Sequence, residues 1–294
     1  MLRRYHMRGL AAVLTTLLLI VSFTSNAYAG YQNSEEPQNI DSIGNKVMSY
    51  EYAYNSLTTD EQKYLAKNPK LAAKRAEKDA KYLLNLMEQE MDDNMDPGLS
   101  PDVTILTTTV PIGSDTTIYT FDTGNKGGSW SGLAAYGANY SAAGKWADVS
   151  CQAWGLGNAG AWAWVGPIAY ISGSGSRTAN IIFSGQGTGS LSAFIGAAAT
   201  GRIRVSIWDY TLGAEIDGTT VWERTASNYE YWSVTGPFTA VVQCTLQAGH
   251  TYALRFGVAT STSAYGVTNA YADFWNDGPG PEGLDGFSVK IDFI

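Results

Sequence analysis

The nine tryptophans of this chain all lie beyond residue 129, in a region that is rich in Gly, Ser and Thr and poor in charge. The stretch before residue 100 has no Trp and carries many charged residues. In the second region, apolar and polar residues alternate in runs that begin at Ile203, Tyr252 and Phe287. Alternation with a period of two predicts half-buried strands with one wet face. We therefore expect residues 101–294 to form an all-β domain, an antiparallel β-sandwich or jelly roll, preceded by a short helical segment.

Two other stretches of the second region concern the connections between strands. Residues 247–250 link two strongly alternating runs and predict a tight hairpin. Residues 159–201 are rich in Gly, Ala and Ser, which weakens strand pairing and specifies its register poorly. We make no assignment for this stretch.

The first 29 residues have the three parts of a secretory signal peptide. Three Arg within the first eight residues precede an apolar run over residues 10–23, and small residues at 27 and 29 suit cleavage before Gly30. The apolar run is shorter than the roughly 18 residues of a typical spanning helix. The sequence therefore predicts a secreted, extracellular protein without a membrane span after cleavage. The alternative is an uncleaved N-terminal anchor.

The charge balance excludes some classes of partner. The chain has 19 basic and 27 acidic residues, a net charge of −8, and removal of the signal makes it more negative. Binding of nucleic acid through phosphates needs clustered Lys and Arg, and attraction to anionic lipid needs the same. We expect neither partner.

Residues 30–100 are expected to be a flexible and helical leader or stalk. Thr58 and Glu61 have the spacing of a capping box, and Asn68-Pro69 predicts the start of a second helix with Asn68 as its N-cap. From Ala72 to Met91, small and apolar residues recur every three or four positions and form one narrow stripe. Four roles remain open: a spacer, a propeptide that is later removed, oligomerisation through residues 56–92, or docking on the β-domain.

The two cysteines lie in runs in which they share a face with apolar neighbours. Cys151 and Cys244 should therefore point into the core, and export favours a disulfide between them. The alternative is two buried free thiols.

The chain offers little for catalysis. His250 is the one His beyond the signal, and the sequence has no nucleophile elbow, phosphate-binding Gly loop or zinc-protease motif. A glycoside hydrolase needs two carboxylates, and no spacing selects a pair among the acidic residues of the second region. These candidates are Asp209, Glu215, Asp217, Glu223, Glu230, Asp273, Glu282 and Asp285. Whether the protein is an enzyme stays open, and the sequence favours a non-enzymatic role.

One Gly/Pro-rich loop, residues 273–286, gathers several oxygen-bearing side chains. Hard oxygen ligands on a flexible loop suit Ca²⁺. We predict a structural calcium site with Asp273, Asp277, Glu282 and Asp285 as ligands, and no other cofactor. The alternative is an ordinary acidic surface loop.

Exposed aromatic side chains are the second candidate binding feature. Trp208 and Tyr210 lie on the strand face opposite Ile203, where we expect water, and Trp232 and Trp275 lie near predicted turns. Aromatic rings can stack on the apolar faces of sugars. We expect these four residues to bind a ligand.

No motif matches a known family, but the aromatic turns, the acidic loop and the Ala248-Gly249-His250 turn before a Tyr252-x-Leu254 strand resemble carbohydrate-binding modules in texture. The leading hypothesis is a secreted, non-catalytic β-sandwich that binds an extracellular ligand, first of all a neutral polysaccharide. The alternatives are a structural component of the cell surface or matrix, which assembles through the helical segment, and a two-carboxylate glycoside hydrolase.

Overall fold

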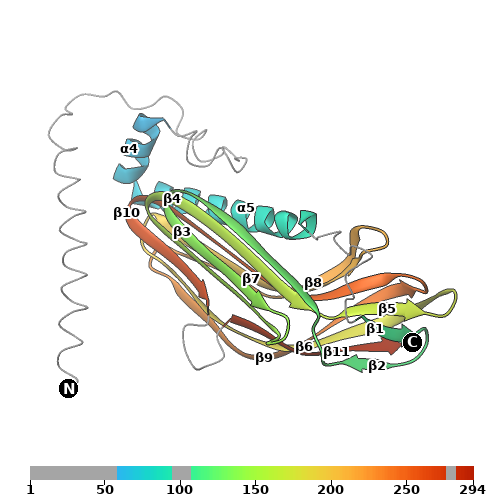
Figure 1. Ribbon diagram of the computed structural model, residues 1–294. Helices are drawn as coiled ribbons and strands as arrows, with labels where there is room; N and C mark the ends of the chain where they lie inside the picture. Colours follow the sequence, from blue (N-terminus) through green and yellow to red (C-terminus); the bar gives the residue numbers. More distant parts are fainter. Residues whose placement is uncertain (1–57, 95–106, 276–282) are drawn as a thin grey trace, which may run out of the picture. The chain divides into compact units, whose positions relative to one another are not determined.

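The computed structural model describes residues 58–94, 107–275 and 283–294, in which two helices precede eleven strands (Figure 1). The helices are α4 (Thr59–Lys67) and α5 (Pro69–Asp93). The strands are β1 (Thr108–Pro111), β2 (Thr116–Ile118), β3 (Thr123–Ser141), β4 (Trp146–Gly166), β5 (Ile168–Ser172), β6 (Ser176–Ala193), β7 (Ala197–Asp209), β8 (Ala214–Ser227), β9 (Tyr231–Gln247), β10 (Thr251–Phe274) and β11 (Gly283–Phe293). The expected all-β main domain and the helical segment before it are both confirmed.

Three long strands fold back on themselves. The ring of Tyr136 lies against Gly128 in the same strand, where an added Cβ would be 2.7 Å from Cδ2 of the ring. Eight residues of straight strand span about 26 Å, so β3 must bend between these positions. The bends of β3, β4 and β10 lie at Gly132, Gly155 and Gly266, which all have positive φ and take a left-handed conformation that other residues avoid. The ladders with β4 shift register at the same level.

The bends divide the strands into two layers, which we call layer A and layer B. Layer A contains residues 123–131 of β3, 157–166 of β4 and 251–265 of β10, followed by β7 and β8. Layer B contains residues 134–141 of β3, 146–154 of β4 and 269–274 of β10, followed by β6 and β9, with β11 beside β6. Among the described strands, all pairings are antiparallel except that of β1 with β5.

The core lies between the two layers. It contains side chains from the alternating runs of β7 and β10, such as Ile203 and Phe256, and from β4, β6 and β11. Phe183 and Phe238 pack around Phe256, with ring centroids 5.3 Å and 6.3 Å from it. The strand residues that alternate with these core residues point away from the core, so each layer also has an outer face.

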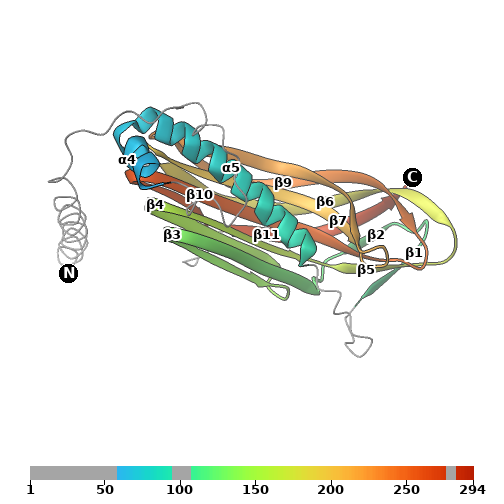
Figure 2. The ribbon, with the colours of Figure 1, turned by 90° about the horizontal axis from the view of Figure 1, so that it is seen from above.

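Helix α5 covers the outer face of layer A (Figure 2). Its apolar stripe is buried in two clusters: Ala72, Ala76 and Ala80 pack with Ala198 and Tyr265, while its later residues pack on Trp162 and Trp164. Of the four roles that the sequence left open, the structure shows docking on the β-domain. The stripe that would pair with another copy is covered by layer A.

The start of the helical segment follows its sequence signals in part. The capping box of Thr58 and Glu61 is confirmed, since each side chain accepts a hydrogen bond from the backbone N–H of the other residue. Pro69 occupies the first turn of α5, but the Asn68 side chain makes no capping bond. Its Nδ2 instead donates to the carbonyl of Tyr64, at 2.9 Å.

The connection at residues 247–250 is a tight turn but not a hairpin. Gly249 has a φ of +86°, and the N–H of His250 donates to the carbonyl of Gln247. In the described chain, however, β9 pairs with β6 and β10 pairs with β4, β5, β6 and β7, so the turn joins strands of different layers. Alternation shows which residues face inward but not which strands are neighbours.

The predicted disulfide is absent, and both cysteines are free thiols. Cys151 lies opposite Ala272 of β10, which pairs with Leu191 of β6, whereas Cys244 pairs with Ala179 of β6. The two levels are therefore separated by about 40 Å along β6. Each thiol faces the core as expected, but at opposite ends of the sandwich. Burial raises the pKa of both thiols to about 12.

Two smaller results complete the fold. A bulge between Gly286 and Ser288 turns Phe287 out of the core, although the residues from Val289 onward keep the expected alternation. No helix in the described ranges is both long enough and apolar enough to cross a membrane.

Candidate functional site

The outer face of layer B carries two rows of side chains that run across five neighbouring strands. Ladder registers align Ala135, Gln152, Tyr271, Ser192 and Tyr231 in the first row. The second row is Gly137, Ser150, Asp273, Ser190 and Ser233. Residues that are opposite each other in a ladder point to the same side of the sheet. Between the rows, Cys151, Ala272 and Leu191 point into the core.

A cavity of about 270 Å³ lies at the β3 end of these rows. Its lining comes from both rows, from two residues between them and from the end of β10, and consists of Ala135, Tyr136, Gly137, Ser150, Cys151, Gln152, Tyr271, Asp273 and Trp275. Hydroxyl, amide, carboxylate and aromatic groups therefore meet in one depression. A concave site with a few polar groups beside aromatic rings is the usual form of a small-molecule or sugar site.

The glycine in the second row makes room for a tryptophan. A Cβ added at Gly137 would lie 3.0 Å from Cζ3 of Trp275 and 3.0 Å from Oγ of Ser150. The indole therefore lies over the backbone of β3 and forms a wall of the cavity. Asp273 fixes this corner, because one of its oxygens accepts from the N–H of Trp275, at 3.1 Å, and the other from the hydroxyl of Tyr271, at 2.9 Å.

Charge is almost absent from the two rows. Asp273 is the one charged residue among the ten, and no Lys or Arg is present. An anionic polymer would meet no cation here, whereas hydroxyl and amide side chains can donate to and accept from sugar hydroxyls. The face therefore suits a neutral, hydroxyl-rich ligand.

Trp275 is thus the one of the four predicted ligand residues that lines this cavity. Trp208 lies on the expected face of β7 and Tyr210 follows the end of that strand, but that face is covered: both pack against the cluster of α5, Trp162 and Trp164. The guanidinium of Arg255 stacks over Trp208, 5.3 Å from the ring centroid. The expectation of an exposed binding surface there was wrong, because the sequence gives no sign that α5 docks on this face.

Trp232 lies elsewhere, at the side of the sandwich formed by β8 and β9. Its ring is stacked by the guanidinium of Arg224, 5.7 Å from the centroid. A second depression, of about 450 Å³, is lined by Trp232 together with Glu77, Lys81, Glu223, Arg224, Thr225, Ser227 and Glu230. The charged groups there pair with each other or with the backbone, as in the contacts of Glu77 with Lys81 and of Glu230 with the N–H of Ser227.

Half of the predicted calcium ligands can be placed. Asp277 and Glu282 lie outside the described residues. Asp273 makes the contacts given above, and Asp285 accepts from the side-chain amide of Gln186, at 2.9 Å. No group of three or more potential metal ligands occurs in the part of the chain that the structure describes. The calcium site stays a prediction.

The catalytic candidates have structural partners. Nδ1 of His250 lies 2.7 Å from Asp209, whose other oxygen accepts from the backbone N–H groups of Thr211 and Leu212. This arrangement braces the turn after β7. Glu215 pairs with Arg204 and Arg255, and Glu223 pairs with Arg202. These carboxylates are therefore committed to ion pairs, so they make no exposed pair for a hydrolase.

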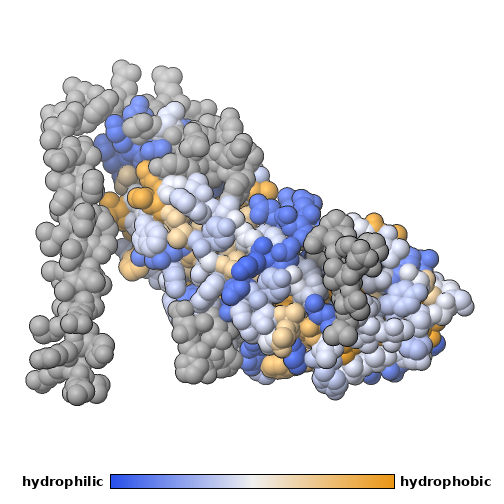
Figure 3. Space-filling model, viewed as in Figure 1, coloured by the Kyte–Doolittle hydropathy of each residue, from blue (hydrophilic) through white to orange (hydrophobic). Residues whose placement is uncertain are grey.

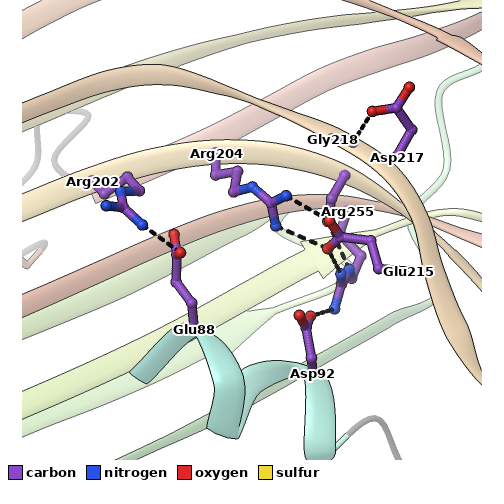
Figure 4. Close-up of polar contacts among 9 residues, drawn as sticks. Glu88, Asp92, Arg202, Arg204, Glu215, Asp217, Gly218 and Arg255 are labelled. Atoms are coloured by element: carbon purple, nitrogen blue, oxygen red, sulfur yellow. Dashed lines mark hydrogen bonds and ion pairs between the residues drawn. The ribbon is translucent and has the colours of Figure 1, made fainter. Parts of the chain in front are cut away.

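The ion pairs form a network between α5 and layer A (Figure 4). Arg255 lies at its centre, with its side chain 2% exposed, and pairs with Asp92 of α5 and Glu215 of β8 while donating to Ser206. Arg202 pairs with Glu88 of α5. Burial raises the pKa values of the Glu88 and Asp92 carboxyls, although the neighbouring arginines oppose this shift. The network fixes α5 on the sheet.

Most of the residues in the two rows were missed by sequence analysis. Ser190 and Ser192 lie in the Gly-, Ala- and Ser-rich stretch 159–201, where register is poorly specified, and Ser150 and Gln152 lie shortly before it. Only the pairing of β4, β10 and β6 brings them together. One signal was available in the sequence: Ser190 and Ser192 are two positions apart, which places both on one face of a strand.

Comparisons with known proteins identify no family. No protein-family model matches the chain, and no curated protein matches it. Solved structures give faint likenesses. A C-terminal family 22 carbohydrate-binding module of Clostridium thermocellum is 11% identical, over 56% of this chain and 84% of that one, with a TM-score of 0.18. A family 11 module from the same organism, solved with a β-1,3-1,4-mixed-linked tetrasaccharide, is 12% identical, over 57% and 88%, with a TM-score of 0.20.

A third likeness is to the enzymatically active domain of tailspike protein 4 of bacteriophage CBA120, at 10% identity, over 58% of this chain and 19% of that one, with a TM-score of 0.22. Several of these neighbours are carbohydrate-binding modules. At such TM-scores the superpositions carry no argument about this chain.

Proposed function

We propose that this protein binds a neutral polysaccharide on the outer face of layer B and does not cleave it. The observation that carries this proposal is the pair of aligned rows across β3, β4, β10, β6 and β9, with the cavity under Trp275 at one end. Hydroxyl and amide side chains supply the hydrogen bonds, and the rings of Trp275, Tyr271 and Tyr231 supply surfaces on which sugars stack.

The rows also give the direction and length of the binding site. A sugar chain that follows them lies across the strands, from Ala135 on β3, beside the cavity, to Tyr231 on β9. Five strands at their usual spacing span roughly 19 Å, which is the length of about four pyranose residues of about 5 Å each. The residues of β6 in the two rows are serines, whose small side chains leave room for the sugar chain to cross the middle of the face.

Affinity electrophoresis tests the proposal directly. The purified protein is run through gels that contain one neutral polysaccharide each, and we expect at least one of them to retard it. Trp275→Ala should weaken retardation about tenfold, the effect of losing a stacking contact worth about 1.4 kcal/mol. Tyr119→Ala is the matched control, because Tyr119 is exposed but lies outside both rows.

Each outcome has a separate meaning. Failure of every neutral polysaccharide to retard the protein would refute the binding function. Retardation that Trp275→Ala and Tyr119→Ala leave equally strong would keep the function but place it elsewhere on the surface. Running the same gels with calcium and with a chelator tests the predicted calcium ion of the 273–286 loop, since loss of retardation with the chelator is expected if calcium holds the Asp273 corner of the cavity.

A further inference from the structure

Strand β3 is the edge strand of both layers on one side of the sandwich. In the described chain it pairs with β4 along its whole length and with no other strand. Its 19 residues bend at Gly132, so its first limb forms the edge of layer A and its second limb the edge of layer B. An open strand edge presents free N–H and C=O groups that can pair with another strand.

The edge carries few of the devices that usually protect such strands, namely one lysine and the register shift at Gly132. Lys126 is the one charged residue of β3, and its Nζ donates to Asn139 of the second limb, at 2.9 Å. The strands at the other side of the sandwich are better protected: β8 carries Glu215, Asp217, Glu223 and Arg224, and β9 contains Pro237. Charged residues and proline discourage pairing at edges. β3 is therefore the edge most open to a further strand.

Large apolar side chains are also exposed along β3. Trp130 and Tyr136 occupy inward-facing positions, opposite the buried residues Ala159 and Cys151. They are nevertheless 58% and 39% exposed, and Leu133 at the bend is 64% exposed. In Figure 3, hydrophobic colour gathers over the bends of β3, β4 and β10, which lie nearest α4. At the β8 and β9 side, the guanidinium of Arg224 stacks on Trp232, which is 42% exposed.

We infer that the β3 edge is a self-association surface that pairs with the β3 edge of a second copy of this chain. Two identical antiparallel edges complement each other about a two-fold axis. An axis that passes through both layers extends layer A into layer A and layer B into layer B at the same time. The near absence of charge on β3 means that two copies meet without repulsion, while Trp130, Leu133 and Tyr136 lose their contact with water.

The size of this surface sets the expected strength of the dimer. One limb of nine residues is about 30 Å long. The two layers are about 10 Å apart, and with their side chains included the edge forms a strip about 15 Å wide. Each copy therefore buries roughly 450 Å², and the pair roughly 900 Å², which is at the low end for a specific interface. The dimer should be reversible and depend on concentration. This inference does not rest on the proposed glycan binding, although Tyr136 also lines the cavity of that site.

Sedimentation equilibrium of the purified protein, from roughly 1 to 100 μM, tests the inference. We expect the mass to rise toward that of two chains. Trp130→Glu places a charge on each edge and should raise the dimer dissociation constant at least tenfold. Val241→Glu is the control, because Val241 is equally exposed, at 54%, but lies on β9. Its dimer should match that of the wild type.

Circular dichroism verifies the fold of each variant. If Trp130→Glu does not fold, Leu133→Lys gives the same test, because that side chain lies at the bend and is more exposed. A wild-type protein that stays monomeric over the whole range would overturn the inference. So would a dimer that the β3 variant and the Val241 control weaken equally, or that the β3 variant leaves intact.

Discussion

Removal of the Arg255 side chain from the network under α5 should cost a large part of the stability of this protein. In Arg255→Met the volume is nearly kept, but Asp92 and Glu215 lose a buried cation, and the stacking on Trp164 and Trp208 is lost. Breaking a buried pair costs about 3–5 kcal/mol. Asp92 is 32% exposed and can regain water, and Glu215 keeps Arg204, so we expect about 3 kcal/mol.

Urea unfolding followed by tryptophan fluorescence measures this change. Most tryptophans lie in the sheet, and a loss of about 3 kcal/mol should also lower the melting temperature by roughly 6–12 °C. Arg224→Met is the matched control: Arg224 is exposed, so we expect less than about 0.5 kcal/mol. A double variant with Asp92→Asn should cost about 1 kcal/mol less than the sum of the single changes. An Arg255→Met protein within about 1 kcal/mol of the wild type would refute the view that this network holds α5 on the sheet.

Three further predictions concern the thiols, the bends and the carboxyls. Burial raises the pKa of Cys151 to about 12, so alkylation of Cys151 at pH 8 should be about a thousandfold slower in the folded protein than in urea. Mass spectrometry without reductant should find no Cys151–Cys244 bond. Comparable alkylation rates in the folded protein and in urea would contradict the burial of Cys151. Gly155→Ala meets no close atom but must keep a φ of +61°, so it should lower the unfolding free energy by about 1–2 kcal/mol, and a neutral result would argue against the bend. Burial also raises the pKa values of Asp79, Glu88 and Asp92, so the folded chain keeps protons there that the unfolded chain has released. Their contribution to stability is therefore largest at acid pH and falls as pH rises through the raised pKa values. In urea titrations from about pH 4 to 8, the unfolding free energy of Asp79→Asn should fall less with rising pH than that of the wild type. The same pH dependence in both proteins would contradict this.

Local patterns in the sequence were enough to predict the class of fold and several of its elements. The alternating runs at Ile203 and Tyr252 became β7 and β10, because period-two burial is a property of a strand and needs no knowledge of its neighbours. The capping box at Thr58 was equally readable, since its two partners are three residues apart. The signal peptide of residues 1–29 stays a prediction, because it lies outside the described residues.

Contacts between distant segments could not be read in the same way. Trp208 is covered because α5 docks on layer A, and the sequence around Trp208 does not indicate this contact. The bends at Gly132, Gly155 and Gly266 decide which strand limbs share a layer, and Gly is too frequent in this chain for three of them to stand out. The rows through Gln152 and Ser190 were missed because their alignment depends on contacts between distant strands. Trp275 was predicted as a ligand residue because a large aromatic residue near an acidic turn is distinctive on its own, and its binding role stays a prediction.

The central claim is that a neutral sugar chain crosses the five strands of layer B. Isothermal titration with neutral oligosaccharides of increasing length, taken from a polysaccharide that retards the protein, tests it most directly. The affinity should rise with each added residue up to about four and then level off. Gln152→Ala, beside the cavity, and Tyr231→Ala, at the far end of the first row, should each weaken binding of the longest ligand. Full affinity for a single sugar, or for a disaccharide with Tyr231→Ala without effect, would contradict the account.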